Sequence, residues 1–378
     1  MASPITNPRF FGVIDEDPFH FDTWSGSSRF FFQALQEKRL LVGATGTEPS
    51  GFAKALLRSL NFRPTRAAWR FAYHTDARVF RARTKVAKRA IAGCENPPDC
   101  ILQIGAWYDM TETGLPTVSY HDGNLARRLN SPYGHPRINQ RHLRKAWEYE
   151  RSLYERLDFI FPMSEWLMRS FIKDFGVRED KLRPVFAGVN LPEVLTLEPP
   201  AYDDQHVLFV GKDFRRKGGH DLMNAFRIVK RRFPNARLTL VGPSQKITGD
   251  GICNLGPITK DSVNGIERIR SIYRSASVFV MPTLYEPFGI AFAEAMAHGL
   301  PCVGTHVCAV PELIVHRENG LLVSPGCPSE LANAICDMLS DPGSRRQLGQ
   351  RGFDRYLKDF RWSRVVSKIS GEVRRGLK

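Results

Sequence analysis

The chain has 378 residues, of which 42% are hydrophobic and 25% charged, and its formal net charge at pH 7 is +15. This length exceeds what one hydrophobic core usually supports, so two domains are expected, and the composition excludes a disordered or fibrous protein. No apolar run reaches the roughly 18–20 residues that span a bilayer, and the N-terminus does not have the pattern of a secretory signal peptide. We therefore expect a cytoplasmic protein with an acidic partner.

The seven cysteines are an odd number, and their spacing does not indicate a metal site. Five residues separate Cys94 from Cys100, and five separate Cys302 from Cys308, which matches no usual zinc site. We interpret all seven as reduced thiols that mostly fill the core, and we predict no metal.

Four apolar runs are expected to form strands in the first half of the chain, at residues 39–44, 100–105, 117–121 and 159–164. They are continuously apolar rather than alternating, which is typical of parallel strands buried on both faces. Before them, "TWSGSSRFFFQAL" predicts a loop at Gly26 and then a helix, which Ser25 or Ser27 would cap.

Residues 61–91 are strongly basic, with nine Lys or Arg against one acid, Asp76. Aromatic residues are interleaved with these cations: Phe62, Trp69, Phe71, Tyr73 and Phe80. One interpretation is a solvated helical face with aromatics in the core, and another is a surface that rests on anionic lipid headgroups. No RNA-binding signature accompanies the stretch, so no nucleic-acid partner is expected.

A second series of strands is expected at residues 207–211, 237–242, 277–282 and 301–305, with helices at 219–233 and 291–299. This alternation predicts a second doubly wound α/β domain. Prolines and acids in "GVNLPEVLTLEPPAYDDQ" indicate the joint. We predict one domain over 1–195, a second over 196–360 and a C-terminal helix over 361–378, with packing of that helix onto the N-terminal domain as one option.

Two loops that follow predicted strands carry the residue types needed to bind a diphosphate and sugar hydroxyls. Lys212 and Lys217 lie in the first loop, where two flexible ammonium groups could converge on one diphosphate, although a solvated basic loop is the simpler alternative. The second loop is part of "YEPFGIAFAEAMAHG", in which a helix is expected to start near Gly289.

The free N–H groups of that first helical turn form an anion site. Glu286 is then in the loop, and Glu294 is about one turn inside the helix, roughly 6–8 Å further along its axis. Glu294 could instead complement the helix dipole. Two carboxylates on either side of an anion site suit a sugar nucleotide, with the hexose at one end and the ribose at the other.

Together the motifs resemble the retaining GT-B glycosyltransferases of family four. The signature of that family is a Glu, seven residues and a second Glu, matched here by "EPFGIAFAEAMAHGLPCV" from residue 286, and its basic loop is matched by "VGKDFRRKGG" from residue 210. The segment "VPELIVHRENGLLVSPGCPSELANAI" matches the usual end of the nucleotide domain. The resemblance is strongest over residues 207–339. It implies an α/β, GT-B fold of two Rossmann-like doubly wound domains facing a central cleft. The N-terminal domain over 1–195 would bind the acceptor, and the domain over 196–360 would bind the nucleotide sugar.

By this resemblance Glu286 contacts the donor sugar hydroxyls and Glu294 the ribose hydroxyls, while Lys212 and Lys217 neutralise the diphosphate leaving group. The backbone that cradles sugar and phosphate would come from three residues: Phe288, Gly289 and Ile290.

The N-terminal half offers further matches to the family. Gly26 and Ser27 would approach the donor phosphate, and His121, at a strand end, would face the donor sugar. With Glu286 and Lys217, His121 completes the predicted catalytic set. Asp122 would orient its loop, and Ser164 would lie near the cleft.

The resemblance implies a retaining transferase that moves a hexose from a nucleotide-diphosphate sugar to a glycan or lipid-linked acceptor, without a metal or other cofactor, in polysaccharide biosynthesis. Residues 61–91 suggest peripheral contact with the inner membrane face. The alternatives are a GT-B sugar-nucleotide epimerase and a catalytically degenerate GT-B protein that binds a sugar nucleotide or an anionic membrane. The donor base and sugar are not readable from the residues, nor is the acceptor.

Overall fold

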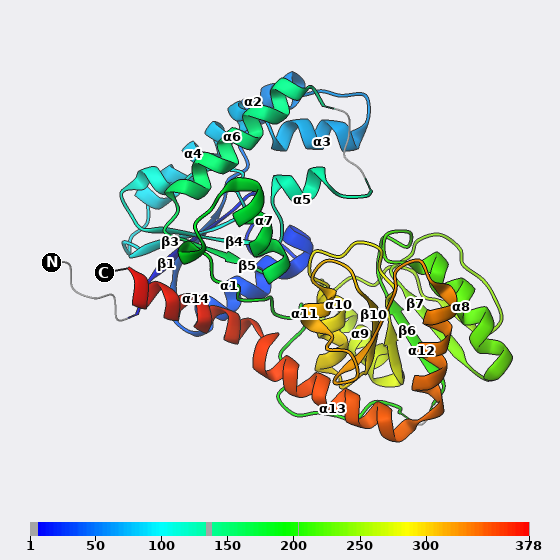
Figure 1. Ribbon diagram of the computed structural model, residues 1–378. Helices are drawn as coiled ribbons and strands as arrows, with labels where there is room; N and C mark the ends of the chain where they lie inside the picture. The colour runs from blue at the N-terminus through cyan, green and yellow to red at the C-terminus, as the bar shows by residue number, and fades with distance from the viewer. Residues whose placement is uncertain (1–6, 134–137, 203, 378) are drawn as a thin grey trace. The chain divides into compact units, whose positions relative to one another are not determined.

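The computed structural model describes residues 7–133, 138–202 and 204–377. The chain forms two compact units, which are described separately. One comprises Met1–Phe186 together with Val365–Lys378, and the other comprises Ala187–Arg364 (Figure 1).

The N-terminal unit is built on a five-stranded parallel sheet with the strand order β2-β1-β3-β4-β5. Its strands are β1 (Phe10–Ile14), β2 (Leu41–Gly46), β3 (Cys100–Ile104), β4 (Thr117–His121) and β5 (Phe159–Pro162). Every residue of β1, β3 and β4 is buried, which explains their largely apolar sequences. This strand order is the flavodoxin-like form of a doubly wound sheet.

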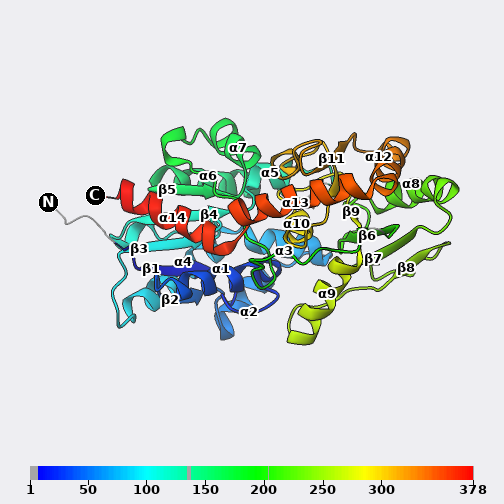
Figure 2. The same cartoon turned by 90° about the horizontal axis from the view of Figure 1, so that it is seen from below.

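Helices cover this sheet, and the last helix of the chain is one of them. The helices of the unit are α1 (Ser27–Glu37), α2 (Gly51–Leu60), α3 (Arg66–His74), α4 (Ala77–Ala92), α5 (Leu125–Leu129), α6 (Gln140–Arg156), α7 (Glu165–Phe175) and α14 (Trp362–Gly376), with short 3-10 helices at Thr23–Gly26, Thr111–Thr113 and Glu179–Lys181. Figure 2 shows α14 beside β5. There Gly376 approaches the ring of Phe159, and Arg183 pairs with Glu372 at 3.2 Å.

The second unit contains a six-stranded parallel sheet with the order β11-β10-β9-β6-β7-β8. Its strands are β6 (His206–Val210), β7 (Arg237–Val241), β8 (Ile252–Asn254), β9 (Val278–Val280), β10 (Cys302–Thr305) and β11 (Gly320–Val323). Counted within the unit, the order is 6-5-4-1-2-3, which is the Rossmann arrangement. The order reverses between β6 and β9, so a crevice for ligands is expected where these two strands end.

The helices of this unit follow from their sequence periodicity. They are α8 (Gly219–Arg232), α9 (Val263–Ser275), α10 (Ile290–Ala297), α11 (Val310–Leu313), α12 (Pro328–Ser340) and α13 (Pro342–Asp359). In α8 the buried positions Leu222, Ala225, Phe226 and Val229 repeat at helical spacing, which buries one face only. In contrast, α10 is buried from Phe292 to Ala297, so it is an internal helix.

The observed division of the chain lies between residues 186 and 187, whereas the sequence placed it between 195 and 196. The prolines that indicated a joint belong to a segment already anchored in the second unit, where Val189 N–H donates to Phe360 O and Val194 N–H donates to the Tyr356 hydroxyl. The second unit ends at Arg364, and α14 begins at Trp362, one residue after the predicted start.

Two further observations bear on the sequence predictions. All seven cysteines are free thiols, but Cys253 and Cys327 are exposed, so the prediction of mostly core cysteines holds only for Cys100, Cys302 and Cys336. Within the described residues, no helix combines the length and apolarity required to cross a membrane.

Candidate active site

The two predicted ligand loops flank the position where the strand order of the second sheet reverses. The first loop joins β6 to α8, and the second joins β9 to α10. They are tied together through Arg216, whose backbone oxygen accepts from Leu284 N–H at 2.9 Å and whose Nη1 donates to Tyr285 O at 2.7 Å. Basic and acidic segments that are about 70 residues apart in sequence therefore form one site.

Glycine makes this close approach of the loops feasible. Gly218 has φ +73°, and a Cβ there would lie 1.8 Å from Pro282 O. No larger side chain fits without moving the second loop, because that neighbour is backbone.

Lys217 and Glu286 form an ion pair across the two loops. Their side chains are only 13% and 8% exposed, and Arg216 Nη1 lies 3.6 Å from the same carboxylate oxygen of Glu286. Burial lowers the pKa of Lys217, and the neighbouring Glu286 carboxylate opposes that shift. An ammonium has three donors, so Lys217 can keep its bond to Glu286 and still donate to a ligand.

The other predicted lysine differs from Lys217 in its surroundings. Lys212 is exposed, and among the described residues it has no carboxylate partner. It lies in the same loop as Lys217, so its flexible ammonium is available to an anion that Lys217 also contacts.

The N-terminus of α10 has no capping side chain, so its backbone N–H groups suit an anion. Its N-cap is Gly289, with φ +104°, which supplies no capping side chain. Phe288 and Gly289 are buried, and Ile290 is the first helical residue. The first-turn N–H groups of an α-helix have no intrahelical acceptor, so they form a preorganised anion site.

Glu294 lies in the second turn of α10 and is 3% exposed. It pairs with Lys260 and accepts a hydrogen bond from the Tyr273 hydroxyl at 3.0 Å. Burial and this carboxylate raise the pKa of Tyr273, so the phenol stays a donor. Because Glu294 is outside the first turn and has these two partners, the alternative role of complementing the helix dipole is not supported.

In the N-terminal unit, the loop before α1 has an unusual backbone. Trp24, Ser25 and Gly26 are three successive residues with positive φ, of 49°, 56° and 87°. The N-cap of α1 is Gly26, and Ser27 is the first helical residue, so the predicted cap by Ser25 or Ser27 is wrong. Gly26 thus begins a helix without a capping side chain, as Gly289 does in the other unit.

His121 lies at the end of β4, as the sequence predicted, but its side chain is buried. Its ring is 1% exposed and packs between Tyr154 and Phe171, with centroid distances of 5.6 and 5.2 Å. Nε2 lies 2.8 Å from Ser119 Oγ, and the ring also bonds to the Gly123 backbone. Burial lowers its pKa to about 3, so the ring is neutral. In this structure the ring is enclosed by its neighbours, and the contact with a donor sugar stays a prediction.

The alternation of side chains along β4 explains why the ring of His121 is buried. His121 points to the face covered by α6 and α7, whereas Tyr120 points to the opposite face, where its ring packs on Trp24 at 5.4 Å. The next residue, Asp122, is exposed and hydrogen bonds to the Trp24 side chain. The exposed polar group at this strand end is thus Asp122, beside the Gly26 loop.

Ser164 has a local structural role. It is fully buried and is the N-cap of α7, where its Oγ accepts from Leu167 N–H at 3.1 Å. This satisfies one of the free N–H groups of the helix.

Sequence reasoning missed three residues of the site: Arg216, Lys260 and Tyr273. Arg216 lies inside the quoted basic loop, and its position between the two lysines was the available signal. Lys260 and Tyr273 precede Glu294 by 34 and 21 residues, and only the fold brings them to it. Among the described residues there is no group of three or more His, Cys, Asp or Glu side chains arranged to hold a metal ion.

Parts of the chain are similar in sequence to known glycosyltransferases. Residues 204–341 match a family described as glycosyl transferases group 1. An uncharacterised glycosyltransferase of Methanocaldococcus jannaschii is 31% identical over 241 residues, which are 59% of this chain and 61% of that protein. The α-maltose-1-phosphate synthase of Mycolicibacterium smegmatis is 25% identical over 250 residues, which are 58% of this chain and 63% of that protein. The chain thus spans about three fifths of these relatives.

Solved structures resemble the whole chain. Sucrose-phosphate synthase from Thermosynechococcus elongatus aligns with a TM-score of 0.71 at 19% identity, covering 97% of this chain and 98% of that one. WaaG, a glycosyltransferase involved in lipopolysaccharide biosynthesis, aligns with a TM-score of 0.64 at 15% identity, covering 97% and 100%. At these identities the similarity establishes the fold alone.

Proposed function

Since the chain has the GT-B fold and carries a group 1 glycosyltransferase domain, we propose that it transfers a hexose from a nucleotide-diphosphate sugar to a glycan or lipid-linked acceptor. We also propose that the transfer retains the anomeric configuration and needs no metal. The observation that carries the proposal is the buried Lys217–Glu286 pair at the position where strand order reverses.

The chemistry follows from where charge develops. When the bond between the anomeric carbon and the diphosphate breaks, its electron pair leaves with the phosphate oxygen. Lys217, Lys212 and the N-terminus of α10 place positive charge where that oxygen would sit, which stabilises the leaving group. Glu286 would accept hydrogen bonds from the donor hexose while it orients Lys217.

The second carboxylate is proposed to bind the ribose. Glu294 would accept from ribose hydroxyls by exchanging its bond to Lys260, which is 27% exposed, while Tyr273 keeps the carboxylate in place. In the N-terminal unit, Gly26 and Ser27 are proposed to approach a phosphate, and Asp122 is proposed to orient its loop.

Names of similar proteins support a nucleotide-sugar donor. HepE from Anabaena was crystallised with UDP and glucose, and a mutant of TarM with UDP. These proteins are 17% and 11% identical to the chain, so they support the class of donor and do not identify its base or sugar.

A screen of UDP-, GDP- and ADP-sugars tests the function. A transferase should hydrolyse one of them slowly without acceptor, and that donor should raise the temperature of unfolding by mass action. Donor binding with no nucleotide release would instead favour a degenerate protein, and conversion of the sugar without release would favour an epimerase.

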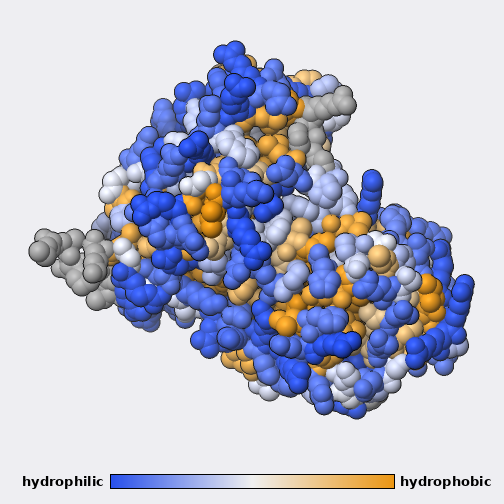
Figure 3. Space-filling view, viewed as in Figure 1, coloured by the Kyte–Doolittle hydropathy of each residue, from blue (hydrophilic) through white to orange (hydrophobic). Residues whose placement is uncertain are grey.

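A membrane surface is proposed as a further partner. Helix α2 exposes Phe52, Leu56 and Leu60 by 82%, 45% and 48%, and these positions are four residues apart on one face. Phe62 follows, 62% exposed. Figure 3 shows hydrophilic residues, in blue, over most of the visible surface of α4 and α6 in the same unit. Apolar side chains beside Lys and Arg are typical of a helix that lies on anionic lipid.

A further inference from the structure

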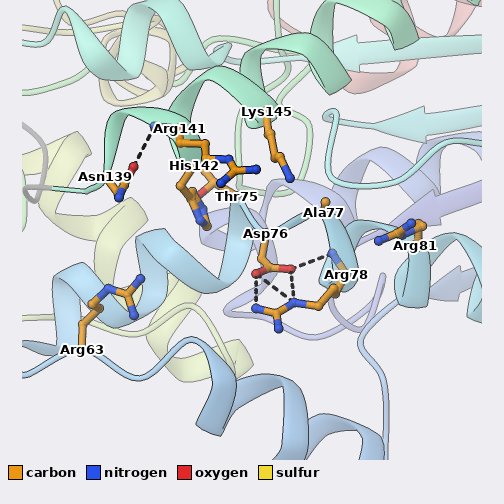
Figure 4. A pocket seen from close by; sticks show the side chains of 10 residues that line it. All are labelled: Arg63, Thr75, Asp76, Ala77, Arg78, Arg81, Asn139, Arg141, His142 and Lys145. Carbon is orange, nitrogen blue, oxygen red and sulfur yellow. Dashed lines mark hydrogen bonds and ion pairs between the residues drawn. The ribbon is translucent and has the colours of Figure 1, made fainter.

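A cavity of about 470 Å³ lies in the N-terminal unit, beside the N-termini of α4 and α6. Figure 4 shows its lining: Arg141, His142 and Lys145 extend from α6, while Asp76 and Arg78 lie opposite, where α4 begins. Arg63, from the segment before α3, and Arg81, from α4, complete the charged part of the lining. The sequence prediction for residues 61–91 did not include the α6 side.

The cavity has five cationic side chains and one carboxylate, and that carboxylate is already used. Asp76 accepts from Arg78 Nη2 at 2.7 Å and Nε at 3.0 Å, and it also caps α4 by accepting from Arg78 N–H. Four cations remain: Arg63, Arg81, Arg141 and Lys145. None of them has a carboxylate partner among the residues that the structure describes.

Unpaired like charges around one cavity repel each other, and the repulsion is relieved when an anion binds between them. The cavity also contains two helix N-termini. Asp76 is the N-cap of the 16-residue α4, and Asn139 is the N-cap of the 17-residue α6. Their macrodipoles add positive potential at the same place.

One side of the cavity is held rigid and neutral. His142 Nε2 lies 2.7 Å from Thr75 Oγ1, and Thr75 Oγ1 also donates to Phe71 O at 2.7 Å. Burial lowers the pKa of His142, and Arg63 and Arg78 add to this shift while Asp76 opposes it. The imidazole therefore contributes shape and hydrogen bonding at neutral pH, and the charge comes from Lys and Arg.

We propose that this cavity binds a phosphate group, with Arg141 and Lys145 on one side and Arg63 and Arg81 on the other. A phosphate carries up to two negative charges and three acceptor oxygens. It can therefore bind several converging cations at once, more than a carboxylate ligand can. The group would belong to a soluble phosphate ester or to a phospholipid headgroup. The site is a binding site only, so it stands independently of the proposed transfer.

The full chain offers a matched pair of variants on α6. Arg141 and Arg144 are both exposed arginines of this helix, but only Arg141 lines the cavity. The double variant Arg141→Gln, Lys145→Gln should weaken binding of glycerol 3-phosphate about tenfold or more by isothermal titration, since charge-assisted hydrogen bonds are lost. Arg144→Gln should bind as the wild type does. The double variant should unfold at the same or a higher temperature than the wild type, because it loses no carboxylate partner and relieves repulsion between cations. Arg144→Gln should unfold as the wild type does.

Two further arms identify the source of the phosphate and separate this site from the diphosphate loop. Vesicles can also bind through the apolar face of α2, so the lipid arm compares variants on phosphatidylglycerol vesicles. Weaker vesicle binding by Arg141→Gln, Lys145→Gln than by Arg144→Gln, with no binding of glycerol 3-phosphate by the wild type, identifies a lipid headgroup as the occupant. The variant Lys212→Ala, Lys217→Ala should keep the cavity site. Equal weakening by Arg144→Gln, loss of the site in the loop variant, or no binding of either probe would overturn the proposal.

Discussion

At the residue scale, the decisive feature is that each site carboxylate already has a cation. Glu286 is held by Lys217 and lies near Arg216, while Glu294 is held by Lys260 and Tyr273. A buried ion pair contributes little net stability, but breaking it by removing one partner leaves a buried charge unpaired. For the proposed function, these pairs would fix the positions of Glu286, Lys217 and Glu294 before the donor binds.

Removal of the two loop lysines should abolish nucleotide release. In Lys212→Ala, Lys217→Ala the leaving group loses two charge-assisted contacts, each worth about 1.5–3 kcal/mol, so release should slow at least a hundredfold. The single variants Lys217→Ala and Glu286→Ala should each abolish transfer without unfolding the chain. Lys358→Ala, on α13 outside both loops, is the control and should release nucleotide normally. Wild-type turnover in the double variant would remove the lysines from the mechanism.

The bond from Tyr273 to Glu294 should be worth more than an ordinary tyrosine bond. Tyr273→Phe removes a donor from a buried carboxylate, with an expected loss of about 1.5–3 kcal/mol in the free energy of unfolding. Tyr202→Phe provides the comparison, because the Tyr202 hydroxyl donates to the neutral carbonyl of Gly299 at 2.7 Å. Its loss should be about 0.5–1.5 kcal/mol. Urea denaturation measures both, and a smaller loss in Tyr273→Phe would show that Lys260 alone satisfies Glu294.

Site residues on the β9–α10 motif could be placed from the sequence because local spacing determines them. As the sequence predicted, Glu286 lies in the loop before the glycine N-cap, and Glu294 lies inside the helix that follows. His121 could not be placed in this way, since one step along β4 decides which face of the sheet a side chain meets. Nothing in the sequence "TVSYHDGN" shows which of two adjacent polar residues points outward.

At the element scale, a buried carboxylate links α6 to the start of α5. Glu150 Oε2 accepts from Leu125 N–H at 2.9 Å and from the Tyr154 hydroxyl at 3.0 Å. Burial raises its pKa to about 7, although these bonds and Arg128 oppose the shift. A carboxyl with a raised pKa in the folded chain favours folding at low pH, and that contribution is lost as the pH rises from about 4.5 through about 7.

The variant Glu150→Gln should remove this pH dependence. Its amide oxygen still accepts from Leu125 N–H, and it has no charge to bury. Relative to wild type, its free energy of unfolding should increase between pH 5 and 8 by roughly 2–3 kcal/mol and then stay constant. Urea denaturation at several pH values gives this difference. A difference that does not change with pH would mean that Glu150 is ionised in the folded chain.

Prediction of elements from the sequence depended on how much signal each contained. Strands such as β3 and β4 were found because a short, mostly apolar run between polar segments is typical of a buried strand. The strand β1, with sequence "FFGVI", was missed between a polar N-terminus and an acidic loop. Short strands such as β8, with three partly exposed residues, have too little pattern to distinguish them from a loop.

At the scale of the whole molecule, the sequence correctly predicted two doubly wound units and the GT-B fold, and the resemblance to the family is supported by the match over residues 204–341. The candidate site of the second unit could be predicted because its residues stand in two short sequence motifs. The binding surfaces of the N-terminal half were harder to predict. Its basic cavity is assembled from α4, α6 and the segment before α3, and the apolar face of α2 precedes the stretch that composition had indicated.

That apolar face leads to a prediction for the entire chain on a membrane. Phe52→Ser, Leu56→Ser removes two exposed apolar side chains from α2, each of which could contribute about 1.5–3 kcal/mol when buried in lipid. Binding to phosphatidylglycerol vesicles at low salt should therefore weaken at least tenfold in a sedimentation assay. Val263→Ser changes a residue that is 76% exposed on α9 and should leave binding unchanged. A helix that inserts apolar side chains into lipid must lose affinity when those side chains become polar. Equal binding by the α2 variant and the wild type would therefore show that any lipid contact is only electrostatic.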